Sequence, residues 1–243
     1  MSITVGSGIT IQNGIVMGEI PIISAGANAH TIVANTNARM STAQAKFGTA
    51  SYTSNSTAGY LRITPFSDFV WGTGDFTMEM WLRPTSVTSA YTLVGFRPPS
   101  TEGLYPNIYV NNNNTVNWYI SAAARITSAL NTLTLNDWNS IAVVRLSGNT
   151  RMYVNGTQTG STYVDNNNYQ AGACIIGAND FQNGTSFFVQ GNLDEIRFSN
   201  VARYSGNYTP ATSQFWPDTF TRLLLHCDGV NNSTSFTDSS SAV

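Results

Sequence analysis

Charged side chains are scarce in this chain. Lys, Arg, Asp and Glu make up 10% of its 243 residues, against about 25% in an average globular protein. The formal net charge is −2 and no basic block occurs, which argues against binding to nucleic acid through phosphate contacts. Asn, Ser, Thr and Gly supply the polar residues instead, a composition found in many extracellular and virion β proteins.

Cysteine is almost absent. Cys174 and Cys227 are the only two, and neither stands in a metal-binding spacing such as C-x-x-C. We expect two buried free thiols rather than a disulfide framework. A chain of this length buries enough surface to fold without a disulfide or a metal ion.

Long apolar runs are also missing. No stretch of 18 apolar residues exists, which predicts that no helix spans or inserts into a membrane. The N-terminus, MSITVGSGIT, has neither a basic segment nor a continuous apolar segment. We therefore expect no secretory signal peptide.

Alternating runs take the place of helices, since no segment of ten or more residues shows helical periodicity. The clearest run is FTMEMWLR at 76–83, which Pro84 ends. Its two faces are Phe76, Met78, Met80 and Leu82 on one side and Thr77, Glu79, Trp81 and Arg83 on the other. Further strands are expected at 60–64, 91–96, 104–110, 115–120, 173–177 and 222–229, and within 187–204, where a turn-like tail at 200–204 follows the strand.

A hairpin is expected over residues 138–159, where two alternating runs flank the turn Ser147-Gly148-Asn149 and Asn155-Gly156 follows. Asn-Gly suits a type I′ turn, because that turn needs a positive φ at both central residues. A series of short strands joined by long Asn-rich loops predicts an all-β sandwich or jelly roll.

The first 27 residues follow a different pattern. Ile3, Ile9 and Ile15 recur every six residues between glycines. Short β runs of this kind cannot bury a face alone. We expect a β-rich arm over 1–27 that serves docking or oligomerisation, with the main domain over 28–243; the alternative is an edge hairpin of that domain.

Several ordered motifs carry a resemblance to a known family. They are KFGTAS, WGTGDFTMEMWLRP, LNDWNSIAVVRLSGNTRMYVNG, GNLDEIRFSNVARYSGNYTPATSQF and LLLHCDG. Together they resemble laminin-G-like (concanavalin A-like) jelly-roll domains of the type found in bacteriophage structural proteins, over residues 28–243. The resemblance implies a two-sheet antiparallel sandwich in a virion protein, which would contact other virion proteins through its arm and form a homo-oligomer.

The order of two segments is informative within that resemblance. In tandem members of the family, a segment like 223–240 precedes one like 29–48, whereas here it lies at the other end of the chain. We therefore expect the strand at 222–228 to close the sandwich beside the strand at 193–198.

Enzymatic function is not expected. Laminarinase-type enzymes of the same fold carry Glu-x-Asp-x-x-Glu on one strand, and this chain has no such run. Asp194 and Glu195 are adjacent, so a regular strand would point them to opposite faces, whereas retaining hydrolysis needs carboxylates about 5–5.5 Å apart. His30 and His226 lie in unrelated segments and suggest no catalytic triad.

Calcium binding is a better explanation for Asp194 than catalysis. The resemblance implies a site on the convex side of the sandwich, held by Asp194 and loop carbonyls, with Asp228 brought near by the closing strand. The alternative is that Asp194 accepts hydrogen bonds from loop N–H groups while Glu195 pairs with Arg197 or Arg203.

Carbohydrate binding is the other role that we consider, because lectin sites combine aromatic rings with amide side chains. The candidates are Trp118, Tyr119, Asn112, Asn113, Tyr163, Asn167 and Tyr169. The alternative for each is an ordinary strand aromatic or turn asparagine. We therefore expect a non-enzymatic phage virion protein (tail fibre, baseplate or head decoration) that contacts the particle surface or host glycans, or else a lectin module or adhesin outside a virion.

Overall fold

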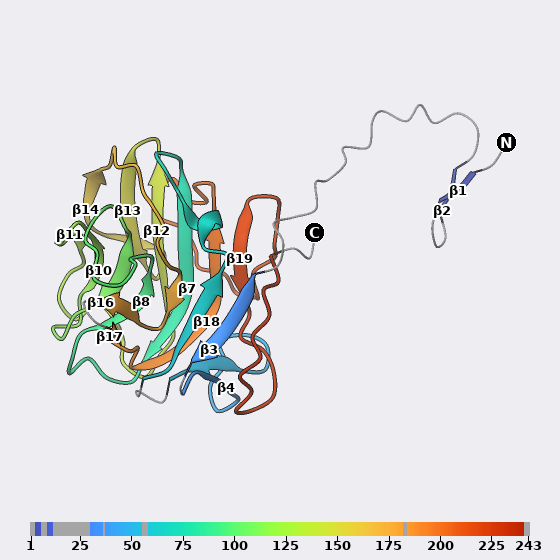
Figure 1. Cartoon of the computed structure of the whole chain (residues 1–243), viewed down its shortest axis with the longest axis horizontal. Coiled ribbons are helices and arrows are strands. Elements are labelled where there is room, and N and C mark those ends of the chain that lie inside the picture. Colours follow the sequence, from blue (N-terminus) through green and yellow to red (C-terminus); the bar gives the residue numbers. More distant parts are fainter. Residues whose placement is uncertain are drawn as a thin grey trace.

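The computed structural model describes residues 3–5, 9–11, 30–35, 37–54, 58–181 and 184–240. These residues form strands and one short 3-10 helix, η1 (Ser67–Phe69), and contain no α-helix. Two antiparallel sheets lie face to face, as Figure 1 shows. The predicted all-β, two-sheet jelly-roll sandwich is confirmed. No helix within these described ranges is long and apolar enough to cross a membrane.

The first sheet has seven strands, all paired antiparallel. In spatial order they are β11 (Ala123–Thr127), β10 (Val116–Ile120), β9 (Asn107–Val110), β8 (Tyr91–Gly95), β15 (Ile175–Ile176), β6 (Tyr60–Thr64) and β3 (Thr31–Asn35). Strands β8 and β15 are adjacent in this sheet although they are far apart in sequence. The sheet therefore brings together segments that are distant along the chain.

The second sheet has eight strands. In spatial order they are β14 (Thr157–Val164), β13 (Asn149–Val154), β12 (Asn139–Leu146), β7 (Phe76–Pro84), β18 (Gly191–Ser199), β5 (Ser51–Thr53) and β4 (Arg39–Ser41), with β19 (Thr221–Leu225) also paired to β18. Two small hairpins complete the described strands: β1 (Ile3–Val5) with β2 (Ile9–Ile11), and β16 (Asn179–Phe181) with β17 (Gly184–Ser186).

The core fills the space between the two sheets, and strand alternation decides which residues enter it. On β7 the predicted shared face of Phe76, Met78, Met80 and Leu82 is confirmed, and this face is the inner one, since all four are buried in the main cluster. Full burial of a side chain of this size stabilises the fold by about 1.5–3 kcal/mol. Cys174 and Cys227 are buried free thiols, as expected.

The outer face of the eight-stranded sheet is also covered. The segment after β18 lies across it and packs Ala202, Tyr204 and Tyr208 against Ala142, Val144 and Tyr153. The backbone turns where the sequence predicts: Asn155 and Gly156 have φ of 51° and 78°. A side chain at Gly156 would collide with the backbone of Tyr208, so this turn also seats the covering segment.

The sandwich closes at its C-terminal end as predicted. β19 pairs with β18, and Ile196 lies opposite Leu225. Asp238 then ties three parts of the chain together: its carboxylate accepts hydrogen bonds from the backbone N–H groups of His30 (3.0 Å) and Leu224 (3.1 Å), and lies 2.7 Å from Nδ1 of His30.

The N-terminal residues form a hairpin sheet of their own. β1 and β2 pair only with each other in the sheet order, with Ile3 opposite Ile11. Ile15, the third member of the six-residue repeat, lies outside the described residues. A docking or oligomerising arm over 1–27 stays a prediction.

Candidate functional site

A cavity of about 200 Å³ opens on the outer face of the seven-stranded sheet. Strands β8, β9 and β10 form its base, and the segment after β8, the start of β16 and residue 187 form its rim. The residues that line it are Ala90, Tyr91, Thr92, Arg97, Asn107, Tyr109, Tyr119, Asn179 and Phe187. Most are polar or aromatic, so the cavity differs from an ordinary gap in apolar packing.

Strand alternation turns these side chains outward. On β9, Asn107 and Tyr109 alternate with Ile108 and Val110, which lie in the core. On β10, Tyr119 likewise follows the buried Trp118. Because successive strand residues point to opposite faces, Asn107, Tyr109 and Tyr119 share the outer face.

A glycine makes room for two amide groups at the base of the cavity. Gly95 on β8 lies opposite Asn107 on β9. A Cβ atom at Gly95 would lie 2.7 Å from Oδ1 of Asn107 and 3.1 Å from Oδ1 of Asn179. The absence of a side chain therefore lets two amide oxygens converge above this strand.

These amide oxygens lack hydrogen-bond donors within the described chain. Asn107 Nδ2 donates to the Tyr105 carbonyl (3.0 Å), which turns Oδ1 toward Gly95. Oδ1 of Asn107, Oδ1 of Asn179 and the hydroxyl of Tyr91 are all buried without a partner in the protein. Leaving such a group unsatisfied costs about 1–3 kcal/mol, so the cavity favours a molecule that supplies hydrogen bonds.

Two tyrosines form an aromatic wall beside the amides. The rings of Tyr109 and Tyr119 meet edge to face, with centroids 5.8 Å apart and planes at 81°. Burial raises the pKa of both phenols, so they remain neutral hydrogen-bonding groups at physiological pH. The ring of Phe187, which is 43% exposed, stands at the rim.

The cavity also contains an ion pair. Arg97 Nη1 lies 2.7 Å from Glu102 Oε1, and the side chains of the two residues are 5% and 52% exposed. Glu102 thus neutralises the guanidinium at the wall of the cavity while its own carboxylate reaches solvent.

The residues predicted to bind carbohydrate do not form one surface. Trp118 and Tyr169 are fully buried in the core with their rings 5.9 Å apart, so a sugar at the surface would touch neither. Tyr119 lies in the cavity. Asn112 and Asn113 are exposed in the β9–β10 turn and do not line the cavity.

Asn167 and Tyr163 belong to a structural network instead. Asn167 Nδ2 donates to the Tyr163 hydroxyl (3.1 Å) and to Asp165 Oδ1 (2.8 Å), and the Asn167 carbonyl accepts from Arg145 Nη1 (2.9 Å). Arg145 is fully buried and donates further to the carbonyls of Gly72 and Gly74, both at 2.7 Å. These contacts hold the loop after β14 against the loop before β7.

The acidic pair on β18 departs from the expected strand geometry. The register with β7 shifts between Asp194 and Arg197, and Glu195 has a φ of 48°. Leu193 and Ile196 both enter the core with two residues between them. The regular strand on which opposite faces were expected for Asp194 and Glu195 is therefore interrupted by a bulge, which places both residues between the core residues Leu193 and Ile196.

Both carboxylates are fully buried and held by the protein. Asp194 accepts hydrogen bonds from the backbone N–H groups of Lys46 (2.7 Å) and Phe47 (3.3 Å). Glu195 accepts from the Phe215 N–H (2.7 Å) and lies 2.8 Å from Nδ1 of His226. The expectation that Asp194 accepts hydrogen bonds from loop N–H groups matches these contacts. The expected pairing of Glu195 with Arg197 or Arg203 is wrong, because Glu195 contacts Phe215 and His226.

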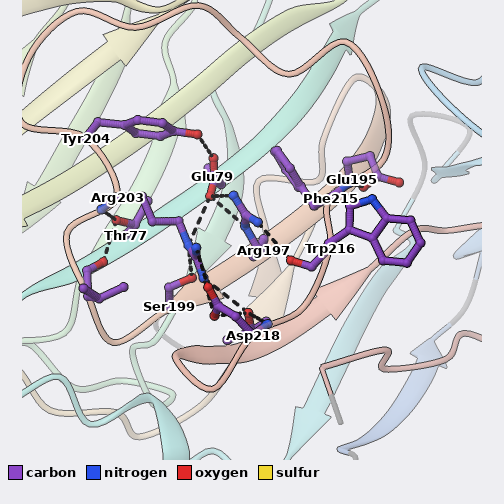
Figure 2. A network of polar contacts seen from close by, with 12 residues as sticks. Thr77, Glu79, Glu195, Arg197, Ser199, Arg203, Tyr204, Phe215, Trp216 and Asp218 are labelled. Atoms are coloured by element: carbon purple, nitrogen blue, oxygen red, sulfur yellow. Dashed lines mark hydrogen bonds and ion pairs between the residues drawn. The ribbon is translucent and has the colours of Figure 1, made fainter. Parts of the chain in front are cut away.

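Arg197 and Arg203 pair elsewhere, as Figure 2 shows. Arg197 Nε and Nη2 lie 2.8 and 2.7 Å from Glu79 Oε1, and the Tyr204 hydroxyl donates to Glu79 Oε2 at 2.6 Å. Arg203 forms two hydrogen bonds to Asp218, at 3.0 and 2.8 Å. This network joins β7, β18 and the covering segment.

The predicted calcium ligands hold a loop in the described structure. Asp228 accepts from the N–H groups of Thr49 and Ala50 and from Gln214 Nε2, and Asp194 accepts from the preceding residues of the same loop. Calcium requires six to eight oxygen ligands, and no group of three or more His, Cys, Asp or Glu side chains suited to a metal occurs in the described part of the chain. In the described structure these carboxylates accept hydrogen bonds from the protein, and calcium binding at Asp194 and Asp228 stays a prediction.

The same carboxylates predict a pH dependence of stability. Burial raises the pKa of Asp194 to about 8, well above the value of about 3.9 in an unfolded chain, so the folded state binds more protons than the unfolded state between these values. The hydrogen bond that His226 makes to the Glu195 carboxylate, with the nearby Asp228 and Asp194, raises the pKa of His226. Both groups therefore make the free energy of unfolding fall as pH rises, Asp194 between about pH 4 and 8 and His226 above about pH 6.5.

Asp194→Asn should make this decline shallower. Urea unfolding at pH 5 and pH 9, in buffer with EDTA, measures the difference for wild type and variant. Asp137→Asn, at an exposed position, is the control and should keep the wild-type slope. Equal slopes for wild type and Asp194→Asn would contradict the assignment.

The sequence relates this sandwich to a known group of proteins. Residues 55–206 match the family described as the concanavalin A-like lectin/glucanases superfamily. The chain belongs to this superfamily. No curated protein matches the sequence. The match spans β6 to β18 and includes the base of the cavity.

Several solved protein structures are similar to this chain in fold. A protein from Bacteroides ovatus ATCC 8483, described as a candidate carbohydrate-binding protein, is 19% identical with a TM-score of 0.56 over 88% of this chain. This chain spans 56% of that protein. The CBM40 module of a Ruminococcus gnavus IT-sialidase, bound to α2,3-sialyllactose, is 11% identical with a TM-score of 0.50, covering 58% of this chain and 84% of that one.

The cavity residues that sequence reasoning missed had a partial signal. NIYV at 107–110 alternates strictly, which places Asn107 and Tyr109 on the face opposite the apolar residues, as the alternation of VNWYI at 116–120 does for the predicted Tyr119. Asn179 and Gly95 had no local signal, because their proximity depends on the order of the strands in the sheet.

Proposed function

We propose that this superfamily member is a non-catalytic carbohydrate-binding domain that holds a sugar in the cavity on its seven-stranded sheet. The observation that carries the proposal is the convergence of two buried, donor-lacking amide oxygens beside a tyrosine wall. Sugar hydroxyls supply donors to such oxygens, and the apolar face of a sugar ring packs on aromatic side chains. Ligand sites of this kind combine an apolar lining with a few placed polar groups.

The names of the two structural neighbours are consistent with this proposal. One is described as a candidate carbohydrate-binding protein and the other was solved with a bound sialylated sugar. Their low identity to this chain limits the likeness to the fold, so the proposal rests on the cavity itself.

Binding to a glycan array, followed by titration calorimetry on the full chain, tests the proposal. Gly95→Ala should weaken binding at least about tenfold, since its Cβ would displace both amide oxygens and a lost hydrogen bond to a buried group costs about 1–3 kcal/mol. Gly206→Ala is the matched control, because a Cβ there meets nothing within 4 Å.

A second variant guards against misfolding of the first. Tyr119→Ala removes one side of the aromatic wall from a half-buried position and should also weaken binding, with the melting temperature followed in parallel. Failure of the wild-type chain to bind any glycan on the array would overturn the proposal. Equal affinity of all three variants would place the binding site elsewhere.

Attachment of this domain to a bacteriophage particle is a separate proposal, supported by the resemblance of its motifs to phage structural proteins. In that setting the first 27 residues would dock the domain to other virion proteins or to sister subunits, and the cavity would face host glycans. Mass spectrometry of purified particles tests it, and absence of the chain from every particle would refute it.

A further inference from the structure

We propose that the cavity selects a single uncharged sugar ring and discriminates against acidic sugars such as uronic and sialic acids. This inference rests on the proposed function and specifies its ligand. It depends on three properties of the cavity: its charge, the kind of hydrogen-bonding atoms at its base, and its size.

The first property is charge. Arg97 is the one charged residue among the described residues that line the cavity, and Glu102 lies 2.7 Å from its guanidinium. The pair is neutral as a unit, and the neighbouring Tyr109 and Tyr119 have raised pKa values because of burial and remain uncharged. A sugar carboxylate that enters would have to compete with Glu102 for the guanidinium.

The second property is the polarity of the base. Asn107 Oδ1 and Asn179 Oδ1 lie 2.7 and 3.1 Å from the position that a Cβ atom on Gly95 would take, so the two acceptors converge beside this glycine. Asn107 is 3% and Asn179 8% exposed, and neither oxygen has a donor in the protein. A hydroxyl or an amide N–H can donate to them, whereas an ionised carboxylate only accepts. A sugar carboxylate placed against the amide oxygens would therefore leave them unsatisfied and add a repulsive contact.

The third property is size. A volume of about 200 Å³ lies below the range of about 300–1,000 Å³ typical of sites for drug-sized ligands. The cavity thus suits one pyranose ring, with the rest of a glycan in solvent beyond the rim at Phe187. A sialic acid, with its carboxylate and glycerol side chain, fits such a site less well than a hexose.

Matched sugars test the charge preference directly. Methyl glucoside and methyl galactoside are compared with the corresponding methyl uronides, which differ only by a carboxylate in place of the CH₂OH group, and lactose is compared with α2,3-sialyllactose. Titration of the full chain by ligand-observed NMR should show at least tenfold weaker binding for each acidic member of a pair whose neutral member binds.

A variant at Glu102 tests whether affinity for acidic sugars can be increased. Glu102→Gln removes the carboxylate that lies beside the Arg97 guanidinium. It should narrow the ratio between the affinities for neutral sugar and uronide at least threefold, which a purely structural role of Glu102 would not do. Uronide or sialyllactose binding as tight as the neutral partner would overturn the inference while leaving carbohydrate binding intact. Absence of binding to any sugar would overturn the proposed function and this inference together.

Discussion

Replacing Glu79 with glutamine is expected to lower the free energy of unfolding by about 3–5 kcal/mol, the range for breaking a buried ion pair. Glu79 is 2% exposed and accepts from Arg197 and from the hydroxyl of Tyr204. Glutamine keeps the shape but removes the charge, so the guanidinium of Arg197 loses its carboxylate partner. The covering segment loses a contact at the same time, because Tyr204 lies on it.

Urea unfolding monitored by tryptophan fluorescence measures this change. Asp137→Asn, at an exposed carboxylate outside this network, is the control and should cost at most about 0.5 kcal/mol. The double variant Glu79→Met with Arg197→Met should be less destabilised than Glu79→Gln, since it leaves no unpaired charge. A loss below about 1 kcal/mol for Glu79→Gln would show that the network contributes little.

Replacing Arg145 with lysine is expected to cost at least about 3 kcal/mol, although the charge is kept. Arg145 donates to four backbone carbonyls, those of Gly72, Gly74 and Asn167 at 2.7–2.9 Å and that of Trp71 at 3.5 Å. Its guanidinium also lies 4.7 Å from the ring centre of Tyr169. A lysine ammonium cannot reproduce this planar set of donors, and each buried acceptor left unsatisfied costs about 1–3 kcal/mol.

The matched control for Arg145 lies on the adjacent strand. Arg151 on β13 is half-buried and lies opposite Val144 on β12, so Arg151→Lys should change stability by no more than about 0.5 kcal/mol. Thermal unfolding followed by circular dichroism gives both values. Equal melting temperatures for Arg145→Lys and Arg151→Lys would contradict the role assigned to Arg145.

The fold could be predicted because its signals are local. The alternation in 76–83 identifies both faces of β7, and Asn155-Gly156 specifies its turn through two adjacent residues. The closing strand was predicted from the order of motifs rather than from periodicity, and its pairing with β18 is confirmed. Each of these inferences needs only a short stretch of chain or its place in the sequence.

The candidate site was less predictable because it is assembled from distant segments. Gly95, Asn107 and Asn179 meet only because β8 lies between β9 and β15 in the sheet. The bulge at Glu195 also has no local sequence signal, since the residue types in this stretch are compatible with a regular strand as well as with a bulged one. Trp118 and Tyr169 were chosen by residue type, and their burial shows that the face of a strand decides more than its composition.

The contact between His30 and Asp238 has a mechanical consequence. It fastens a residue just before β3 to one that follows β19, so residues 30 and 238 lie at neighbouring points of the sandwich. A pulling force applied through these two residues would act first on this contact and would peel the segment after β19 away from its neighbours. The paired strands of the two sheets would bear little of that force until the segment had detached.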